Sequence, residues 1–417
     1  MLIQPSRRAF LKSSAGLIAL AQGVPQFLLS ASARAAESPG ETVLVVIQLS
    51  GGNDGLNTVI PYADDGYRKA RPSLAVGQST VRKIDDHVGF HPSMEGFSKL
   101  LEAGRLGVVQ GVGYPNPDRS HFSSMDIWHT ARPDLYKGRG ERDGPGHRVT
   151  GWIGRCLDCN APTSAHGDMP ALHLGSGRLP LALVGEQIRV SSVSALEGFR
   201  LDAADDRVVK AMRQAAAAKR PGDDDLVAFL QRGTLSAMDS SKRVQESLGR
   251  YTTDVKYPDS TLASRLKTVA QLIDAGLGTR VYYLDLDGFD THANQAAAHA
   301  GLLTELSAAM NAFVTDLDKH GHGKRVLTMT FSEFGRRVKE NASQGTDHGA
   351  AAPLFVAGGK VKSGLIGKYP SLSDLDEGDL KFTTDFRAVY AAVLEQWLGV
   401  PSAPVLGAKF EPVKVTA

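Results

Sequence analysis

The stretch from Lys324 to Gly359 constrains the fold of this chain more than any other part of its sequence. An apolar run at Val326–Phe331 has the length and composition of a buried strand. A polar loop follows and carries the triplet Asp347–Gly349, which reads Asp-His-Gly, directly before a second apolar run at Pro353–Ala357. An acid, a histidine and a glycine between two buried strands are typical of α/β proteins, which place polar chemistry at the strand ends of their sheet.

Further apolar runs predict the rest of the sheet. They occur at Thr42–Leu49, Leu106–Val112 and Arg280–Leu286, with shorter ones at Leu172–Leu174 and Leu181–Val184. Helical patterns lie at Ser93–Gly104, before Lys319 and at Asp385–Leu398. We therefore predict one α/β domain with a doubly wound, mainly parallel sheet flanked by helices. Apolar residues at helical spacing from about 205 to 276 predict a helical cap or insertion on this domain.

The bulk composition excludes two classes of partner. The chain has 417 residues, of which 42% are hydrophobic and 22% charged, as in an ordinary globular protein. Its 47 Lys and Arg are scattered among 45 Asp and Glu, so the basic stripe of a nucleic-acid-binding protein is missing. No apolar run of about 18 residues follows the N-terminal segment, so we expect no stable membrane span.

The N-terminal 35 residues are predicted to be an export signal. Ser6–Lys12 contains a twin-arginine pattern, a weakly apolar segment follows at Ala15–Leu29, and Ala33–Ala35 resembles a cleavage site. A chance Arg-Arg pair before a core helix is the alternative. We expect a mature domain of residues 36–417 in the periplasm or outside the cell. Because this route carries folded proteins, often loaded with a metal or cofactor, it also hints at one.

The two cysteines, Cys156 and Cys159, are the only ones in the chain. Their segment offers too few further ligands for a metal site. A local disulfide would be possible in an oxidising compartment, and two incidental cysteines on a helix are the alternative. We assign them no function.

Polar residues follow three of the predicted strands. Asn53 and Asp54 lie in a Gly-rich turn after the first strand, where they either approach a ligand or cap a helix. Asp290 and His292 follow the strand that ends at Leu286, and they indicate a metal or catalytic site unless the histidine is an ordinary loop residue.

Ser120 and His121 follow the strand at Leu106–Val112, where a helix is expected to begin. The Ser120 hydroxyl would either cap that helix or act as a nucleophile aided by the positive end of the helix dipole. His121 would either exchange a proton with the substrate or lie on the surface as a plain histidine.

Five motifs carry a resemblance to a known family. They read LSGGNDGLNTVIP, GVGYPNPDRSHFSSMDIW, DGFDTHANQ, TFSEFGRR and TDHGAAAPLFVAGG, in that order along the mature chain. Together they resemble the bacterial exported family called domain of unknown function 1501, which is grouped with the alkaline phosphatase and sulfatase superfamily. The resemblance implies an alkaline-phosphatase-like α/β fold with a site at the strand ends. Members of that superfamily hydrolyse or transfer phosphate or sulfate esters with a Ser, Thr or modified Cys nucleophile and one or two divalent metals.

The resemblance also implies roles for single residues. It puts Asp54 near the first-strand carboxylate of the superfamily, Ser120 near its nucleophile, and Asp290 and His292 where an Asp and a His bind one metal. Ser332–Gly335 stands where phosphatases carry Asp-His-Gly, with His348 as the final metal ligand. In the other registration, Asp347–Gly349 is itself the Asp-His-Gly element.

The chain departs from the superfamily pattern at three places. Phe334 replaces a metal-binding histidine in the first registration, Ser50–Asn53 displaces the first-strand acid, and the spacing of Asp290 to His292 is shorter than usual. A site with missing ligands would bind one metal weakly or none. The fold therefore transfers more safely than the reaction.

Three functions follow as hypotheses. The first is an exported metal-assisted hydrolase of a small-molecule or polymer phosphate or sulfate ester, with Ser120 and His121 as catalytic residues and Zn, Mn, Mg or Ca as the metal. Its predicted metal ligands are Asp54, Asp290, His292, Glu333, Asp347 and His348, and its predicted substrate-binding residues are Asn53, Arg119 and Arg336. The second is a metal-free serine hydrolase that uses Ser120, Asp290 and His348 without a G-x-S-x-G elbow. The third is a non-catalytic binding or assembly protein on a degenerate phosphatase-like scaffold.

Overall fold

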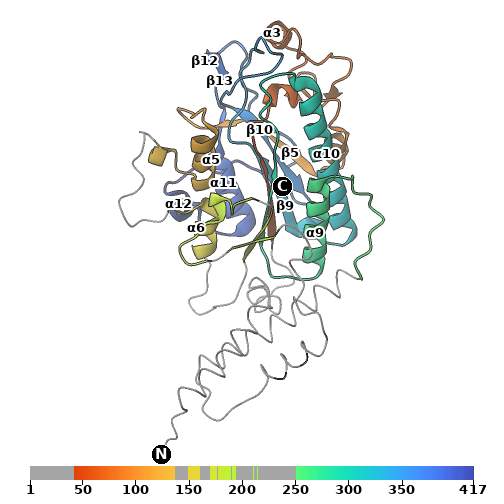
Figure 1. The fold of residues 1–417 in the computed structure, drawn as a ribbon, viewed down its shortest axis with the longest axis vertical. Coiled ribbons are helices and arrows are strands. Elements are labelled where there is room, and N and C mark those ends of the chain that lie inside the picture. Colours follow the sequence, from red (N-terminus) through yellow and green to blue (C-terminus); the bar gives the residue numbers. More distant parts are fainter. Residues whose placement is uncertain are drawn as a thin grey trace, which may run out of the picture.

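The structure is a computed structural model that describes residues 42–136, 149–159, 170–175, 177–188, 190–193, 210, 214 and 250–417. Its central sheet contains the long strands β1 (Val43–Leu49), β5 (Leu106–Gly113), β8 (Val281–Leu286), β9 (Val326–Phe331) and β10 (Ala352–Gly358). Shorter strands complete it, namely β6 (Ala171–Leu174), β7 (Ser191–Val193), β11 (Gly364–Ile366) and β14 (Thr384–Asp385). The order is β11-β5-β10-β9-β1-β8-β6-β7, with β14 beside β5 (Figure 1).

The sheet is parallel except where β10 takes part. β1 pairs in parallel with β8 and β9, and the pairs on both flanks are also parallel. β10 runs antiparallel to β5 and β9. A parallel return would require a crossover, usually a helix, whereas the loop of residues 332–351 leads straight back into the sheet. This loop therefore stays at the edge where the parallel strands end, and the expected mainly parallel sheet is confirmed.

Helices cover both faces of the sheet. On β1, Val45 and Ile47 pack into one core with helices α4 (Glu95–Glu102), α9 (Thr261–Asp274) and α10 (Gln295–Lys319). Leu44 and Val46 point the other way and pack with helices α5 (His121–Thr130), α6 (Trp152–Cys159), α11 (Phe386–Ala392) and α12 (Ser402–Leu406). In Figure 1, α9 and α10 lie on one side of the strands and α5, α6, α11 and α12 on the other. The predicted doubly wound arrangement is confirmed.

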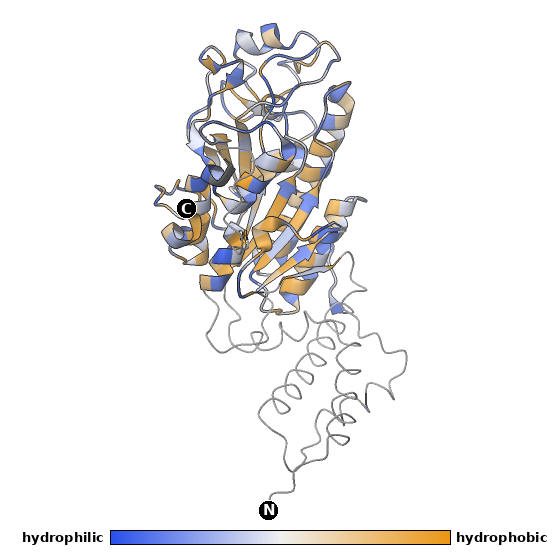
Figure 2. Cartoon of the chain, turned by 60° about the vertical axis from the view of Figure 1, so that its left-hand side comes forward, coloured by the Kyte–Doolittle hydropathy of each residue, from blue (hydrophilic) through white to orange (hydrophobic). Residues whose placement is uncertain are grey.

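Apolar residues are concentrated in these two interfaces. Figure 2 shows the orange of hydrophobic residues on the strands and on the adjoining helices, with more blue in the loops at the upper end. A fully buried strand needs apolar side chains on both of its faces, and β1, β8 and β9 meet that need. No helix among the described residues is both long and apolar enough to cross a membrane.

Short elements cover the edge at which the parallel strands end. They are η1 (Gly55–Asn57), the three-stranded sheet of β2 (Val59–Ile60), β4 (Gly89–Phe90) and β3 (Arg82–Lys83), helix α3 (Asp65–Ala70), and the hairpin of β12 (Leu375–Asp376) and β13 (Asp379–Leu380). They enclose a small apolar core of their own around Leu56 and Tyr67. The segment that follows β1 thus has a packed structure of its own.

One expectation about local structure is wrong. Leu181–Val184 is not a strand, because the segment forms the 3-10 turn η3 (Leu181–Leu183), in which the Leu183 amide donates to the Pro180 carbonyl at 3.0 Å. The last predicted helix, Asp385–Leu398, is confirmed: α11 continues without a break into the π-helical segment η6 (Val393–Leu398). Cys156 and Cys159 lie on α6 as free thiols, so the alternative of incidental cysteines on a helix describes them.

Parts of the prediction lie outside the described residues. The expected signal peptide is among them, as is most of the expected helical insertion from 205 to 276. Within that insertion, α9 is described, and its Ser260 side chain caps the helix by accepting from the Ala263 amide.

Candidate functional site

The loops that follow β1, β8 and β9 meet at one edge of the sheet, because these three strands are adjacent and parallel. Gly51 follows β1 with a φ of +115°, and a side chain there would place its Cβ 2.3 Å from the amide nitrogen of Asp290. Only glycine allows this approach. The Gly51 amide donates to Glu333 Oε1 at 2.8 Å, so the three loops are tied together.

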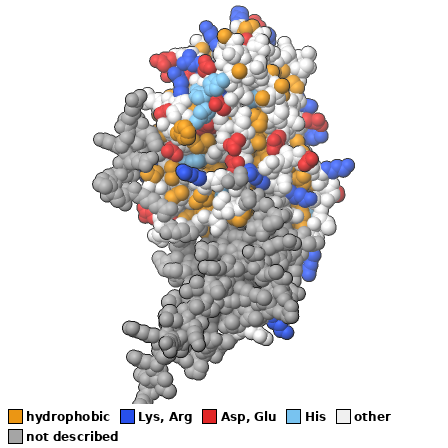
Figure 3. Space-filling view, in the orientation of Figure 1, with side chains coloured by type: hydrophobic (Ala, Val, Ile, Leu, Met, Phe, Trp, Pro, Cys, Tyr) orange, Lys and Arg blue, Asp and Glu red, His pale blue; other side chains and the backbone are white. Residues whose placement is uncertain are grey.

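Three histidines surround one oxygen of Asp290. Asp290 Oδ1 lies 3.0 Å from His292 Nε2, 3.3 Å from His348 Nε2 and 3.4 Å from His121 Nε2. His121 begins α5, His292 lies in the loop before α10, and His348 lies in the loop between β9 and β10. We call these four residues the histidine cluster. Figure 3 shows histidine side chains, in pale blue, gathered in a patch on the surface of the face that it draws.

The other ring nitrogen of each histidine has its own partner. His348 Nδ1 lies 2.8 Å from the Arg119 carbonyl, His121 Nδ1 lies 2.8 Å from Glu333 Oε1, and His292 Nδ1 lies 3.4 Å from Asp347 Oδ1. A carbonyl or carboxylate oxygen can only accept, so each neutral ring carries its proton on Nδ1 and a lone pair on Nε2. Metal-binding histidines are held by such outer contacts.

The spacing of the donor atoms fits a metal ion. In a tetrahedral centre with arms of about 2.0–2.1 Å, neighbouring donor atoms lie about 3.3 Å apart. The three distances to Asp290 Oδ1 are close to this value, and His292 Nε2 lies 2.8 Å from His348 Nε2. Two imidazole lone pairs face each other favourably only with a proton or a cation between them. Ligand atoms of His121, Asp290 and His348 all lie within 4.8 Å of one another, and His292 Nε2 adjoins two of these residues without joining that group. Imidazoles and a carboxylate suit a divalent ion such as Zn or Mn.

Arg336 is the buried centre of these loops. Its guanidinium donates to the carbonyls of Gly52 at 2.7 Å, Thr346 at 2.7 Å and Phe289 at 3.1 Å, to that of Gly51, and to Asp290 Oδ1 at 2.8 Å. Burial would raise the pKa of Asp290, but Arg336 and the neighbouring histidines lower it to about 2. Since its N–H groups bind the protein itself, Arg336 does not have the predicted role of a substrate-binding side chain.

Arg119 also differs from its prediction. Its side chain turns away from the histidine cluster and donates to Asp379 Oδ2 at 2.6 Å, so the guanidinium is already neutralised. Only its backbone carbonyl serves the cluster, through His348. The residue therefore orients a histidine and does not bind an anion.

Ser120 lies between the two residues that contact His348. It is the N-cap residue of α5, but its hydroxyl makes no capping hydrogen bond, and the side chain is exposed. Its backbone amide donates to Asp118 Oδ1 at 2.7 Å. The capping alternative is thus wrong. A triad with Ser120, His348 and Asp290 also disagrees with the structure, because His348 uses Nδ1 for Arg119 and directs Nε2 at Asp290 and His292.

Asn53 and Asp54 lie in a different, buried cluster. Asp54 Oδ2 accepts from Arg71 at 2.5 Å and from Gln295, and Asn53 Oδ1 accepts from Thr58 and from His299 at 3.0 Å. Both side chains are almost inaccessible, at 0% and 1% exposure. The predicted metal-binding role of Asp54 and the predicted substrate contact of Asn53 therefore do not fit the geometry.

Glu333 and Asp347 are not members of the histidine cluster, but each contacts one of its rings. Glu333 binds His121, and Asp347 binds His292 while accepting from Asn341 Nδ2 at 3.0 Å. Phe334 is buried, with its ring 4.9 Å from that of His121 and 4.6 Å from that of His348. The two alternative alignments of the Asp-His-Gly motif thus point to the same region of the structure, where Glu333 and Asp347 each contact a histidine ring of the cluster.

A wide cleft opens beside the histidine cluster. Its volume is about 770 Å³, and His121, Asp290 and Glu333 line one end. Its floor continues over β1, β8 and β6 with Gln48, Asp285 and His173, and Phe122 lies at its wall. A cleft of this size suits an organic ligand, since small-molecule sites occupy roughly 300–1,000 Å³.

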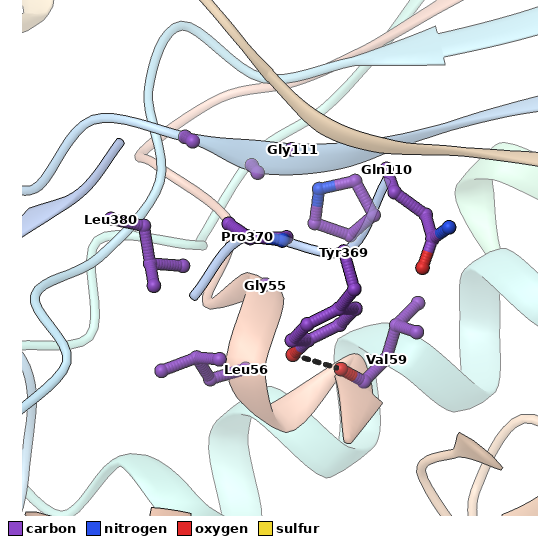
Figure 4. A pocket seen from close by; sticks show the side chains of 11 residues that line it. Gly55, Leu56, Val59, Gln110, Gly111, Tyr369, Pro370 and Leu380 are labelled. Carbon is purple, nitrogen blue, oxygen red and sulfur yellow. Dashed lines mark hydrogen bonds between the residues drawn. The ribbon is translucent and has the colours of Figure 1, made fainter. Parts of the chain in front are cut away.

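A second cavity is too small for such a ligand. It lies between η1 and β5, is lined by apolar groups around Leu56, Val59 and Leu380, and measures about 20 Å³. Figure 4 shows Tyr369 reaching across it to the carbonyl of Val59, at 3.2 Å. This volume holds roughly one water molecule. Two further clefts, of about 530 Å³ beside His87 and about 590 Å³ beside Tyr257, are large enough for an organic ligand, but neither is lined by the histidine cluster. The cleft of about 770 Å³ is the candidate binding site because His121 and Asp290 line it.

Several residues of the site were not predicted. Arg71 lies in the irregular segment after the first strand, where no pattern marks it. Gln48 and Asp285 had a visible signal, because each is a polar residue inside an otherwise apolar strand. His173 contacts Asp285 at 3.4 Å and Ser192 Oγ at 2.8 Å on the cleft floor.

The fold and the histidine cluster together define a doubly wound α/β protein with a candidate metal centre where its parallel strands end. Within that class, the chain belongs to the family "Protein of unknown function (DUF1501)", whose model matches residues 41–400. The family resemblance of the five motifs is thereby confirmed. Comparison of the sequence with curated proteins gives no match.

Several solved structures are similar to this one at low sequence identity. The lipoteichoic acid synthase LtaP from Listeria monocytogenes is 8% identical with a TM-score of 0.40, over 92% of this chain and 77% of that one. The PsFucS1 sulfatase from Pseudoalteromonas sp. is 9% identical with a TM-score of 0.40, over 99% and 78%. A protein in the alkaline phosphatase superfamily from Vibrio parahaemolyticus is 8% identical with a TM-score of 0.40, over 88% and 69%.

Proposed function

We propose that this protein is an exported metal-assisted hydrolase of phosphate or sulfate esters. The observation that carries the proposal is the convergence of three imidazole Nε2 atoms on Asp290 Oδ1 at the mouth of a cleft of about 770 Å³. The four residues of the histidine cluster would hold one divalent ion. Such an ion lowers the pKa of a bound water or hydroxyl and neutralises charge on ester oxygens.

The protein's own residues supply orientation and a nucleophile. Glu333 and Asp347 fix the rings of His121 and His292, so that their lone pairs point to one position. Ser120 is the candidate nucleophile, because its hydroxyl is exposed at the N-terminus of α5, where the helix dipole favours a developing negative charge. In this arrangement His121 holds the ion and does not transfer a proton.

The cleft would bind the organic part of the ester. Its floor presents hydrogen-bonding side chains, and its wall presents the ring of Phe122, which is 86% exposed. The substrate would thus be an ester of a sizeable alcohol, either a small molecule or one end of a polymer. The twin-arginine pattern supports export to the periplasm or beyond, with the ion loaded before transport.

The first experiment combines elemental analysis with an activity assay. The protein, produced through its own export signal, is assayed with aryl phosphate and aryl sulfate esters with and without a chelator. We expect bound metal and chelator-sensitive turnover, and loss of both in His292→Ala and His348→Ala. His87→Ala, in an exposed loop, is the matched control and should change neither.

One observation favours a second candidate function. Arg336 already neutralises Asp290 at 2.8 Å, as in a scaffold that has lost its metal and only binds a partner. A folded protein that contains no metal and hydrolyses neither ester would support this non-catalytic binding function and contradict the hydrolase.

A further inference from the structure

Asp54, the acid that follows the first strand, forms a buried ion pair with Arg71. Asp54 Oδ2 and Arg71 Nη1 are 2.5 Å apart, and both side chains are 0% exposed. Burial would raise the pKa of Asp54, but the Arg71 guanidinium lowers it below its ordinary value, so the carboxylate is charged and paired. An ion pair sealed from water in this way is broken only at high cost.

Arg71 is also fixed by its remaining hydrogen bonds. Its Nε donates to the Val338 carbonyl at 3.0 Å, its Nη2 to the Arg337 carbonyl at 2.9 Å, and its Nη1 also to Asn57 Oδ1 at 2.8 Å. These contacts join the segment after β1 to the loop that contains Arg336. If the guanidinium left Asp54, its hydrogen bonds to the Val338 and Arg337 carbonyls would also be lost.

The other groups around Asp54 do not offer metal ligands. His299 directs Nε2 at Asn53 Oδ1, an oxygen that only accepts, so Nε2 carries a proton and has no lone pair to give. Asp54 Oδ1 and Asn53 Nδ2 are both buried, and neither has a hydrogen-bond partner among the described residues. One acceptor and one donor suit a bridging water molecule and do not suit a divalent ion.

We propose that the protein holds a single metal ion, in the histidine cluster, and that the Arg71 guanidinium replaces a second ion beside Asp54. The inference rests on the proposed metal-assisted function and adds the number and place of the ions. Among the described residues, His121, Asp290 and His348 form the group that gathers three metal-binding side chains within 4.8 Å. Asp54 lies outside it, held by a cation that is part of the chain.

The test counts metal ions in the full exported protein. It is dialysed against excess Zn²⁺ or Mn²⁺, freed of unbound ion and analysed for metal per chain, and calorimetric titration of the metal-stripped protein gives an independent count. We expect one ion in the wild type, one in Asp54→Asn and none in His292→Ala. The wild-type count alone separates one ion from two, so the test holds even where Asp54→Asn does not fold.

The outcomes separate this inference from the proposed function. Two ions in the wild type, with one lost in Asp54→Asn, would overturn the inference and leave a metal-assisted hydrolase standing. A folded wild type that binds neither metal would overturn the metal-assisted function and the inference with it. One ion that is lost in Asp54→Asn and kept in His292→Ala would place the centre at Asp54 and overturn the inference.

Discussion

The histidine cluster and the buried cluster around Asp54 have the same origin in the fold but differ in the exposure and the neighbours of their central acid. Both are built from loops that leave adjacent parallel strands at one edge of the sheet. In the histidine cluster, Asp290 is 48% exposed in its side chain and is surrounded by lone pairs. In the buried cluster, Asp54 is fully covered and faces a guanidinium. An acid at a strand end is therefore a candidate ligand where its carboxylate stays accessible to other donor atoms, as that of Asp290 does beside Arg336, and not where it is buried against a cation of the chain, as that of Asp54 is.

The source of that cation explains why the two sites differ. Arg71 comes from the segment around α3, which packs over the sheet edge with a core of its own. Arg336 comes from the loop between β9 and β10 and donates to Asp290 Oδ1, the same oxygen that the three histidines approach. The pair of Arg71 and Asp54 is thus fully buried, whereas Arg336 is buried but leaves Asp290 partly exposed.

The largest effect should come from breaking the buried pair. Arg71→Ala leaves a buried, unpaired carboxylate, and we expect the free energy of unfolding to fall by about 3–5 kcal/mol. Urea unfolding followed by circular dichroism measures this loss. The double variant Asp54→Asn with Arg71→Met should recover most of the stability, because the buried charges are then removed together. A loss below about 1 kcal/mol would show that Asp54 finds another partner.

The next effect should appear at the histidine cluster. Glu333→Gln keeps the size of the side chain but weakens its hold on His121, and outer partners of this kind contribute about 10–100-fold to metal affinity or activity. Competition with a chromophoric chelator measures the affinity, and the aryl ester assay measures kcat/KM. Glu340→Gln is the control, since Glu340 binds Ser73 and Leu74 away from the cluster. Equal affinities in both variants would contradict the role of Glu333.

The sequence predicted the sheet better than it predicted the site. β1, β8 and β9 matched to within a residue, because unbroken apolar runs have few alternatives in a doubly wound fold. The sequence did not predict that β10 runs antiparallel to its neighbours, because this direction depends on the absence of a crossover helix between β9 and β10. The local meeting of Asp290 and His292 was predicted from their spacing along the chain.

The partners of the predicted residues could not be predicted, because they come from distant segments. Arg71 pairs with Asp54 across 17 positions, His121 with Glu333 across 212, and Arg336 with Gly52 across 284. The family resemblance named the acids but not their cations. The predicted roles of Asp54 and Arg119 were therefore corrected by the structure, which shows their ion pairs with Arg71 and Asp379.

A smaller effect should follow from pH. Burial lowers the pKa of His129 to about 3 and that of His299 to about 4, below the ordinary 6.5. The unfolded chain therefore binds more protons than the folded one in this range, so stability is highest above pH 6.5 and falls as the pH drops towards 4. Each histidine contributes a slope of roughly 1.4 kcal/mol per pH unit.

Urea unfolding between pH 7 and 4.5 tests this prediction. In His129→Gln the side-chain amide can still donate to Gln48, as the imidazole does at 2.8 Å, but it does not titrate. We expect a shallower pH dependence in this variant, whereas exposed His87→Gln should follow the wild type. An unchanged slope in His129→Gln would mean that His129 is charged in the folded protein.

The smallest effect should come from the cleft wall, which belongs to neither cluster. Phe122 is 86% exposed beside His121 and lines the cleft, so its ring would cover the organic part of a bound ester. Aromatic contacts are worth about 0.5–1.5 kcal/mol, so Phe122→Ala should raise KM for a bulky ester about twofold to tenfold. Phe382→Ala, an exposed phenylalanine away from the cleft, is the matched control. A change in kcat with KM unaltered would show instead that Phe122 positions His121, which would extend the histidine cluster to the cleft wall.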